Sequence, residues 1–277
     1  MTPPSGPAAD RIRAAGPRGV FRGGEGQPLV LLHCAGMTWR VWEPVLPLLA
    51  AHRDVLAPTL PAHLGGPPLP DTPVTIGDFA DAVERELDAA GFECPDIVGN
   101  SLGGFIAFEL ARRGRVRRVV AIGAMGMQTD RQGLAIAGRV VQAHRVGRAL
   151  RPAVLPVLAF PWARHILLRA GVVRGERVPT ALARHLFHAS ATCDAPALHT
   201  AMRTADGTMP RLDDAGQITA PTLLIRGDHD TAATADQMER YLNQLPNAQL
   251  LTIPGAGHCP QLELPNLIAN EILKFTR

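Results

Sequence analysis

The chain contains a serine in a sequence typical of an activated nucleophile, Gly99-Asn100-Ser101-Leu102-Gly103. A short apolar run, Asp96–Val98, precedes it, and an amphipathic segment, Phe105–Arg113, follows it. A sharp strand-to-helix turn strains such a serine and needs small flanking residues. The helix N-terminus behind it favours developing negative charge. The pattern predicts Ser101 as a nucleophile, and a helix-capping serine in an ordinary turn is the alternative.

A serine hydroxyl becomes a useful nucleophile when a base removes its proton. Among ten histidines, His258 has the best position, because its glycine-rich loop follows the predicted last strand, Gln249–Ile253. We therefore expect His258 to be the general base. An ordinary surface-loop histidine is the alternative at this position.

The base also needs a carboxylate that fixes its tautomer and stabilises its charged form. Asp230 follows the predicted strand Thr222–Ile225 and is expected to fill this role. Asp228 competes for it, and one of the two would then be a turn-forming aspartate. The chain order is serine, aspartate, histidine.

Attack on a carbonyl creates an oxyanion, which backbone N–H groups stabilise. One donor is expected from Leu102, directly after the nucleophile. The second is expected from Ala35, in the loop His33–Gly36 that follows a predicted strand. An ordinary strand exit is the alternative reading of this loop.

These residues need a scaffold that brings distant segments to one edge. Short apolar runs alternate with helical patterns, which predicts an α/β fold with a mostly parallel sheet. The predicted strands are Leu29–Leu32, Val55–Leu60, Asp96–Val98, Val116–Ile122, Thr222–Ile225 and Gln249–Ile253. A helix is expected to begin after Thr75, capped by Asp78, and to end at Gly91. Further helices are expected at Phe105–Arg113, Ala235–Leu245 and Pro265–Thr276.

The alternation stops after Ala124, where prolines, arginines and apolar patches with helical spacing continue to about Pro210. We expect a flexible N-terminal tail over 1–16, a core over 17–124 and 211–277, and a helical cap insertion over 125–210.

Composition excludes several classes of protein. A formal net charge of +3 and 4% aromatic residues argue against a nucleic-acid binder. Four scattered cysteines without a CxxC pair argue against a metal site or a disulfide framework. The N-terminus lacks the apolar core of a secretory signal, and prolines and arginines interrupt Ala153–Val173, so we expect a cytoplasmic protein without a membrane segment.

Together, the motif, its strand-and-helix setting and the order of the three residues resemble the α/β-hydrolase superfamily over about Gly19 to Arg277. The resemblance implies a doubly wound, mostly parallel sheet of about eight strands, a variable helical cap, and no metal or organic cofactor. The chain departs from the family pattern in three places, at His33-Cys34, Thr59–His63 and Cys259. Two of these departures place the thiols of Cys34 and Cys259 near the expected pocket. These thiols would either make the protein sensitive to alkylation or serve as small packing residues.

The expected activity is hydrolysis of an ester, thioester or lactone of a small to medium, moderately hydrophobic molecule through an acyl-enzyme. Serine at position 101 argues against the aspartate-nucleophile branches of the superfamily, since their ester intermediate needs a carboxylate. Asn100 keeps carbon–carbon bond hydrolysis open as an alternative. A cofactor-free lyase or cyclase and a ligand-binding receptor on the same fold also remain open.

The predicted cap carries the clue to the substrate. Between Asp130 and Ala205 there are eleven arginines and three acidic residues, an excess of eight positive charges. Such a surface would attract an anionic substrate or an acidic carrier protein, and a solvated arginine-rich surface is the alternative. The residues expected at the substrate pocket are His33, Cys34, Met125, Trp162 and Cys259.

Overall fold

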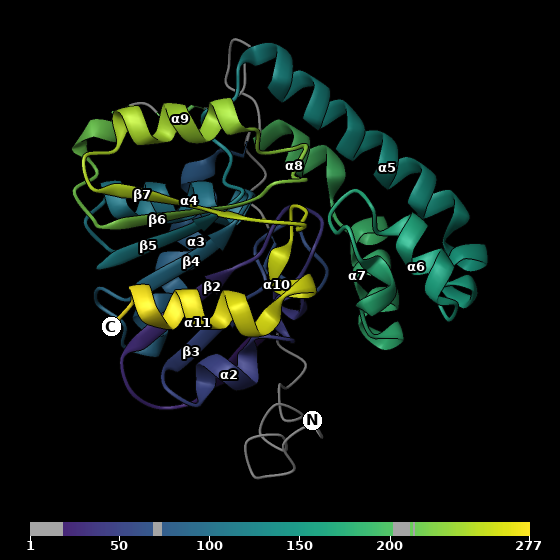
Figure 1. Ribbon diagram of the computed structural model, residues 1–277, viewed down its shortest axis with the longest axis horizontal. Coiled ribbons are helices and arrows are strands. Elements are labelled where there is room, and N and C mark those ends of the chain that lie inside the picture. Colours follow the sequence, from purple (N-terminus) through teal and green to yellow (C-terminus); the bar gives the residue numbers. More distant parts are fainter. Residues whose placement is uncertain (1–18, 69–73, 202–210, 213) are drawn as a thin grey trace.

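A computed structural model describes residues 19–68, 74–201, 211–212 and 214–277. Its strands are β1 (Val20–Gly23), β2 (Pro28–Leu32), β3 (Asp54–Pro58), β4 (Asp96–Asn100), β5 (Arg118–Ile122), β6 (Thr222–Gly227) and β7 (Ala248–Ile253). They form one sheet in the order β1-β3-β2-β4-β5-β6-β7 (Figure 1). Only β1 is antiparallel to its neighbour. The predicted α/β class with a mostly parallel sheet is therefore confirmed.

The strand count differs from the expected number. Within the described residues the sheet has seven strands instead of about eight, because a single strand, β1, precedes the first parallel strand. That strand pairs with β3, Val20 lying opposite Pro58, and it ends the sheet on this side. The predicted N-terminal tail over 1–16 lies outside the described residues.

The helices connect and cover these strands. They are α2 (Leu46–Ala50), α3 (Ile76–Ala90), α4 (Leu102–Arg112), α5 (Asp130–Val157), α6 (Pro161–Leu167), α7 (Thr180–Thr192), α8 (Ala195–Ala201), α9 (Ala235–Gln244), α10 (Pro260–Glu263) and α11 (Pro265–Phe275). Three short 3-10 turns join them, η1 (Trp39–Trp42), η2 (Gly175–Arg177) and η3 (Ala215–Gln217).

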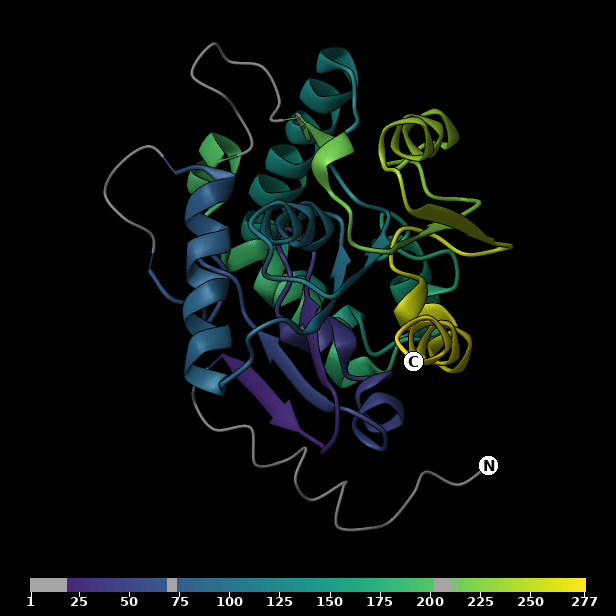
Figure 2. The same cartoon turned by 90° about the vertical axis from the view of Figure 1, so that its left-hand side faces the viewer.

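The sheet separates two hydrophobic cores. Successive side chains of a strand point to opposite faces, so Leu29 and Leu31 of β2 belong to one core while Val30 and Leu32 belong to the other. Helices α3, α4 and α9 pack in the second core, and α2 and α11 pack in the first (Figures 1 and 2). Strands buried on both faces explain the continuous apolar runs of the sequence.

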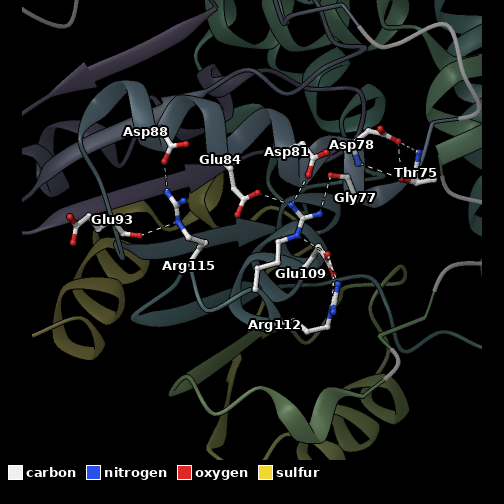
Figure 3. A network of polar contacts seen from close by, with 11 residues as sticks. Thr75, Gly77, Asp78, Asp81, Glu84, Asp88, Glu93, Glu109, Arg112 and Arg115 are labelled. Atoms are coloured by element: carbon white, nitrogen blue, oxygen red, sulfur yellow. Dashed lines mark hydrogen bonds and ion pairs between the residues drawn. The ribbon is translucent and has the colours of Figure 1, made fainter.

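Helix α3 confirms the local signals in the sequence. The Thr75 hydroxyl accepts a hydrogen bond from the Asp78 N–H, the Asp78 carboxylate accepts one from the Thr75 N–H, and Gly91 ends the helix with φ +74°. Ion pairs then join α3 to α4 (Figure 3). The guanidinium of Arg113, the residue that follows α4, bonds to Glu84 of α3 at 2.7 Å and to Glu109 of α4 at 2.8 Å. These contacts help to hold the helix that follows Ser101.

Every regular element described between β5 and β6 is a helix or a 3-10 turn. Helices α5, α6, α7 and α8 lie together beside the sheet, and we call them and their connecting loops the insertion (Figure 1). Helix α5 packs against α7 and α8. No helix in the described part of the chain is long and apolar enough to cross a membrane.

Candidate active site

Ser101 sits at the turn between β4 and α4 with a strained backbone, φ +55° and ψ −110°. Its N–H donates to the Ile122 carbonyl of β5 at 2.9 Å, and its carbonyl accepts from the Phe105 and Met125 N–H groups at 3.1 and 3.2 Å. The side chain makes no capping hydrogen bond to α4. Ser101 is therefore not the helix-capping serine of the alternative interpretation, and a strained backbone is typical of a functional residue.

Glycines make this turn possible. A side chain on Gly99 would overlap the carbonyl of Gly103, and one on Gly103 would overlap the carbonyl of Leu32 in β2. Small residues are needed on both sides of Ser101, as predicted, because the backbone at each of these two positions lies very close to other backbone atoms. Helix α4 begins at Leu102, three residues before the predicted start, since packing against the sheet outweighs the low helix propensity of the two glycines.

Asp230 and His258 form a hydrogen-bonded pair beside this turn. Asp230 follows β6 and His258 follows β7, and the imidazole Nδ1–H donates to Asp230 Oδ2 at 2.7 Å. The other carboxylate oxygen accepts from the N–H groups of Ala232 and Ala233 at 2.8 and 2.9 Å. The carboxylate side chain is 1% exposed and the imidazole 14%. This arrangement fixes the ring, and Nε2 has no hydrogen-bond partner among the described residues.

The two groups shift each other's proton affinity. Burial alone would raise the pKa of Asp230, but the nearby His258 charge and the hydrogen bonds to the carboxylate bring that pKa below its ordinary value. Burial would likewise lower the pKa of His258, yet the Asp230 carboxylate raises that pKa above its ordinary value. The pair therefore favours an aspartate anion beside a histidine that accepts a proton readily.

Asp228, the competing carboxylate, has a different contact. Its Oδ1 accepts from the Gly255 N–H at 2.8 Å, which joins the turn after β6 to the loop after β7. Asp228 is thus bonded within these turns, and Asp230 is the carboxylate that contacts His258.

Gly123 is a site residue that sequence reasoning missed. It follows β5, has φ +52°, and its N–H donates to Ile225 of β6. An added Cβ would lie 2.8 Å from Asp230 Oδ2 and 2.9 Å from His258 Nδ1. The only available signal was a glycine at the end of a predicted strand.

Asn100 connects the turn at Ser101 to the loop that carries His258. Its amide Nδ2 donates to the Ile122 carbonyl at 2.9 Å and to the His258 carbonyl at 3.1 Å. Its Oδ1 accepts from the Gln261 side chain at 3.0 Å and from the Cys259 thiol at 3.3 Å. The residue before Ser101 thereby holds the backbone of His258 close to Ser101.

Two buried histidines shape the loop that follows β2. The Leu60 N–H donates to His33 Nε2 at 2.8 Å, so the His33 Nδ1–H donates to the Cys34 carbonyl at 2.9 Å. The Gly36 N–H donates to His63 Nε2 at 2.9 Å, and the His63 Nδ1–H donates to the Pro61 carbonyl. Both rings must be neutral to accept these bonds.

Burial supports this protonation state. It lowers the pKa of His33 well below its ordinary value, and the nearby His63 lowers it further. Burial also lowers the pKa of His63 to about 4, against the opposing effect of its hydrogen bond to Pro61. Sequence reasoning noted His63 only as part of an unusual motif.

The predicted oxyanion donors lie at the loop and turn just described. Ala35 lies between the two residues held by His33 and His63, and Leu102 is the first residue of α4. Within the described residues, neither of their N–H groups donates to another protein group. Backbone N–H groups without a partner in the described part of the chain are the type of donor that an oxyanion requires.

The remaining predicted pocket residues differ in their burial and in their contacts. Cys34 and Cys259 are buried free thiols whose Sγ atoms lie 3.9 Å apart. Met125 is buried, and its N–H bonds to Ser101. Trp162 lies on α6 with 61% of its surface exposed, and its ring stacks on Phe160. The structure thus brings four of the five predicted pocket residues, including His33, to the turn and loops around Ser101.

Comparison with known proteins agrees with this architecture. Residues 29–271 match the model of the alpha/beta hydrolase family. The chain therefore belongs to the α/β-hydrolase family.

Two curated relatives cover most of the chain. Epoxide hydrolase EphH of Mycobacterium tuberculosis is 31% identical over 71% of this chain and 92% of its own length. A pimeloyl-(acyl-carrier protein) methyl ester esterase of Aromatoleum aromaticum is 32% identical over 86% of this chain and 93% of its own length. A meta-cleavage product hydrolase of Pseudomonas fluorescens IP01 shares the fold, with a TM-score of 0.72 and 23% identity over 92% of both chains.

Proposed function

We propose that this protein is a serine hydrolase that cleaves an ester, thioester or lactone through an acyl-enzyme. The observation that carries the proposal is the buried Asp230–His258 pair beside a strained Ser101 whose hydroxyl does not cap α4. Ser101, His258 and Asp230 would act as nucleophile, general base and orienting carboxylate.

The chemistry follows from the positions of these groups. His258 Nε2 removes the proton of the Ser101 hydroxyl while Oγ attacks the substrate carbonyl. The N–H groups of Ala35 and Leu102 bind the oxyanion, and each such donor contributes about 3–4 kcal/mol to lowering the barrier. The oxyanion collapses, the leaving group departs with the proton held by His258, and Ser101 remains acylated. A water molecule, deprotonated by His258, then attacks the ester, and the acid and the free serine hydroxyl are released.

The substrate class rests on the insertion and on a relative. The excess of arginine in the insertion favours an anionic molecule or an acidic carrier protein. The Aromatoleum relative is named for a methyl ester on an acyl-carrier protein. We propose a moderately hydrophobic acyl group with a negative charge on the substrate or on its carrier. Epoxide opening, for which the Mycobacterium relative is named, is not proposed, because position 101 holds a hydroxyl instead of a carboxylate.

Carbon–carbon bond hydrolysis is the second candidate. Asn100 before the nucleophile favours it, and a meta-cleavage product hydrolase has the same fold. Asn100 bonds to the His258 carbonyl and to the side chain of Gln261 in α10, so it has a structural task in either reaction.

Labelling with a fluorophosphonate and a screen of p-nitrophenyl esters test the proposal. We expect one phosphonyl group on Ser101 of the wild-type protein and no label on Ser101→Ala. Turnover of the best ester should fall by about 10⁴-fold or more in the variant, with an unchanged circular dichroism spectrum. Turnover retained by Ser101→Ala would refute the assignment. A tightly bound ligand released unchanged would indicate a receptor, and turnover without any covalent intermediate would indicate lyase or cyclase chemistry.

A further inference from the structure

A loop of the insertion packs against the loop that carries the catalytic histidine. We call residues 171–174, between α6 and η2, the cap loop, and residues 255–259 the histidine loop. The Cys259 N–H donates to the Gly171 carbonyl at 2.8 Å. A Cβ on Gly257 would lie 2.9 Å from the same carbonyl, so the two backbones approach as closely as glycine allows.

Glu263, at the end of α10, joins the two loops by its carboxylate. Oε2 accepts from the Gly257 N–H at 2.7 Å. Oε1 accepts from the N–H groups of Val173 and Arg174 at 2.6 and 2.9 Å. The residue is 5% exposed, and none of the cationic side chains in the described part of the chain forms an ion pair with it. Three backbone donors from two loops therefore replace water around this buried carboxylate.

These contacts surround His258. The residues on either side of it, Gly257 and Cys259, are both anchored, one through Glu263 and the other to the cap loop. Its own carbonyl accepts from Asn100, the neighbour of Ser101. The backbone of the histidine is thus fixed to the insertion on one side and to the nucleophile strand on the other.

We propose that Glu263 is a positioning residue: it links the position of the cap loop to the orientation of the His258 imidazole. The inference rests on the proposed function, since it assigns the histidine as the base. Both carboxylate oxygens are needed as acceptors. An amide of the same shape would turn its NH₂ toward the N–H of one loop, and the bond to that loop would be lost.

The first experiment measures the coupling without any reaction. Amide hydrogen exchange, resolved by residue, is compared between the wild-type protein and Glu263→Gln. We expect the Cys259 amide to exchange about tenfold faster or more in the variant, although Glu263 does not bond to it, because its partner carbonyl belongs to the other loop. Glu271→Gln on α11 controls for loss of a carboxylate, and Arg174→Ala controls for the side chain of a residue whose contact with Glu263 is made by its backbone N–H. Unchanged exchange at Cys259 in Glu263→Gln would overturn the coupling.

The second experiment separates positioning from folding. Two esters with the same acyl group are compared well below the melting temperature, one with a p-nitrophenol leaving group and one with ethanol. An alkoxide leaving group needs a proton from a well-placed His258, whereas p-nitrophenolate does not. We expect kcat/KM of Glu263→Gln, which reports the acylation step, to fall about tenfold more for the ethyl ester than for the p-nitrophenyl ester. Equal losses for both esters would show that Glu263 only supports the fold.

The two claims fail in different ways. A wild-type protein that neither turns over esters nor accepts a phosphonyl group would overturn the proposed function, and with it the catalytic part of this inference. An active wild-type protein whose Glu263→Gln variant keeps its exchange and its leaving-group profile would overturn the inference alone.

Discussion

Acidification should destabilise this protein through His63, which supports the loop that follows β2. The ring accepts a hydrogen bond from the Gly36 N–H, so a protonated ring cannot keep this contact. Burial lowers the pKa of His63 from 6.5 to about 4 in the folded protein. In the unfolded chain the imidazole returns to its ordinary pKa.

The sign and size of the effect follow from these two values. As the pH falls through 6.5 the unfolded chain binds the proton first, so the free energy of the unfolded state falls relative to that of the folded state. The loss of stability grows until about pH 4, below which both states are protonated. At 1.36 kcal/mol per unit, a shift of about 2.5 units removes about 3 kcal/mol. Stability is therefore fully present above pH 6.5 and declines between pH 6.5 and 4.

Urea unfolding at a series of pH values measures this loss. His63→Gln keeps an amide acceptor but does not titrate, so between pH 6 and 4.5 its stability should fall less steeply than that of the wild-type protein. At pH 5 the difference in slope approaches one proton, or about 1.4 kcal/mol per pH unit. The variant His52→Gln, at an exposed position, controls for loss of an imidazole. Parallel stability curves for the wild-type protein and His63→Gln would refute the neutral, buried histidine as the source of acid sensitivity.

Two further outcomes follow from the geometry of the site. Gly123→Ala places a methyl group 2.8 Å from Asp230 Oδ2 and at a positive φ, so kcat for the best ester should fall about 100-fold or more. Gly138→Ala in α5, with open space around it, should leave kcat unchanged. Equal activities of the two variants would contradict the close approach. His258 must be neutral to act as a base and its pKa is raised, so kcat/KM should rise with pH through a midpoint above 6.5; a midpoint below 6.5 would contradict the effect of Asp230.

Local signals in the sequence determined the elements and the order of the site residues. The apolar runs that became β2 and β4 could be identified because strands buried on both faces need continuous apolar side chains. The limits of α3 could be read from Thr75, Asp78 and Gly91, since capping depends on neighbours a few residues away. The Gly-x-Ser-x-Gly turn marked Ser101 for the same reason: its strain is local and demands glycine on either side.

Tertiary structure decided what depends on contacts between distant segments. Strand β1 has four residues and is defined by its pairing with β3, so its own sequence carried little signal. The contacts of Asp230 and Asp228 depend on how the turn after β6 meets the loop after β7. Gly123 and Glu263 became meaningful only when loops from β5, β7 and the insertion met, because hydrogen bonds and steric limits act through space and leave no spacing pattern along the chain.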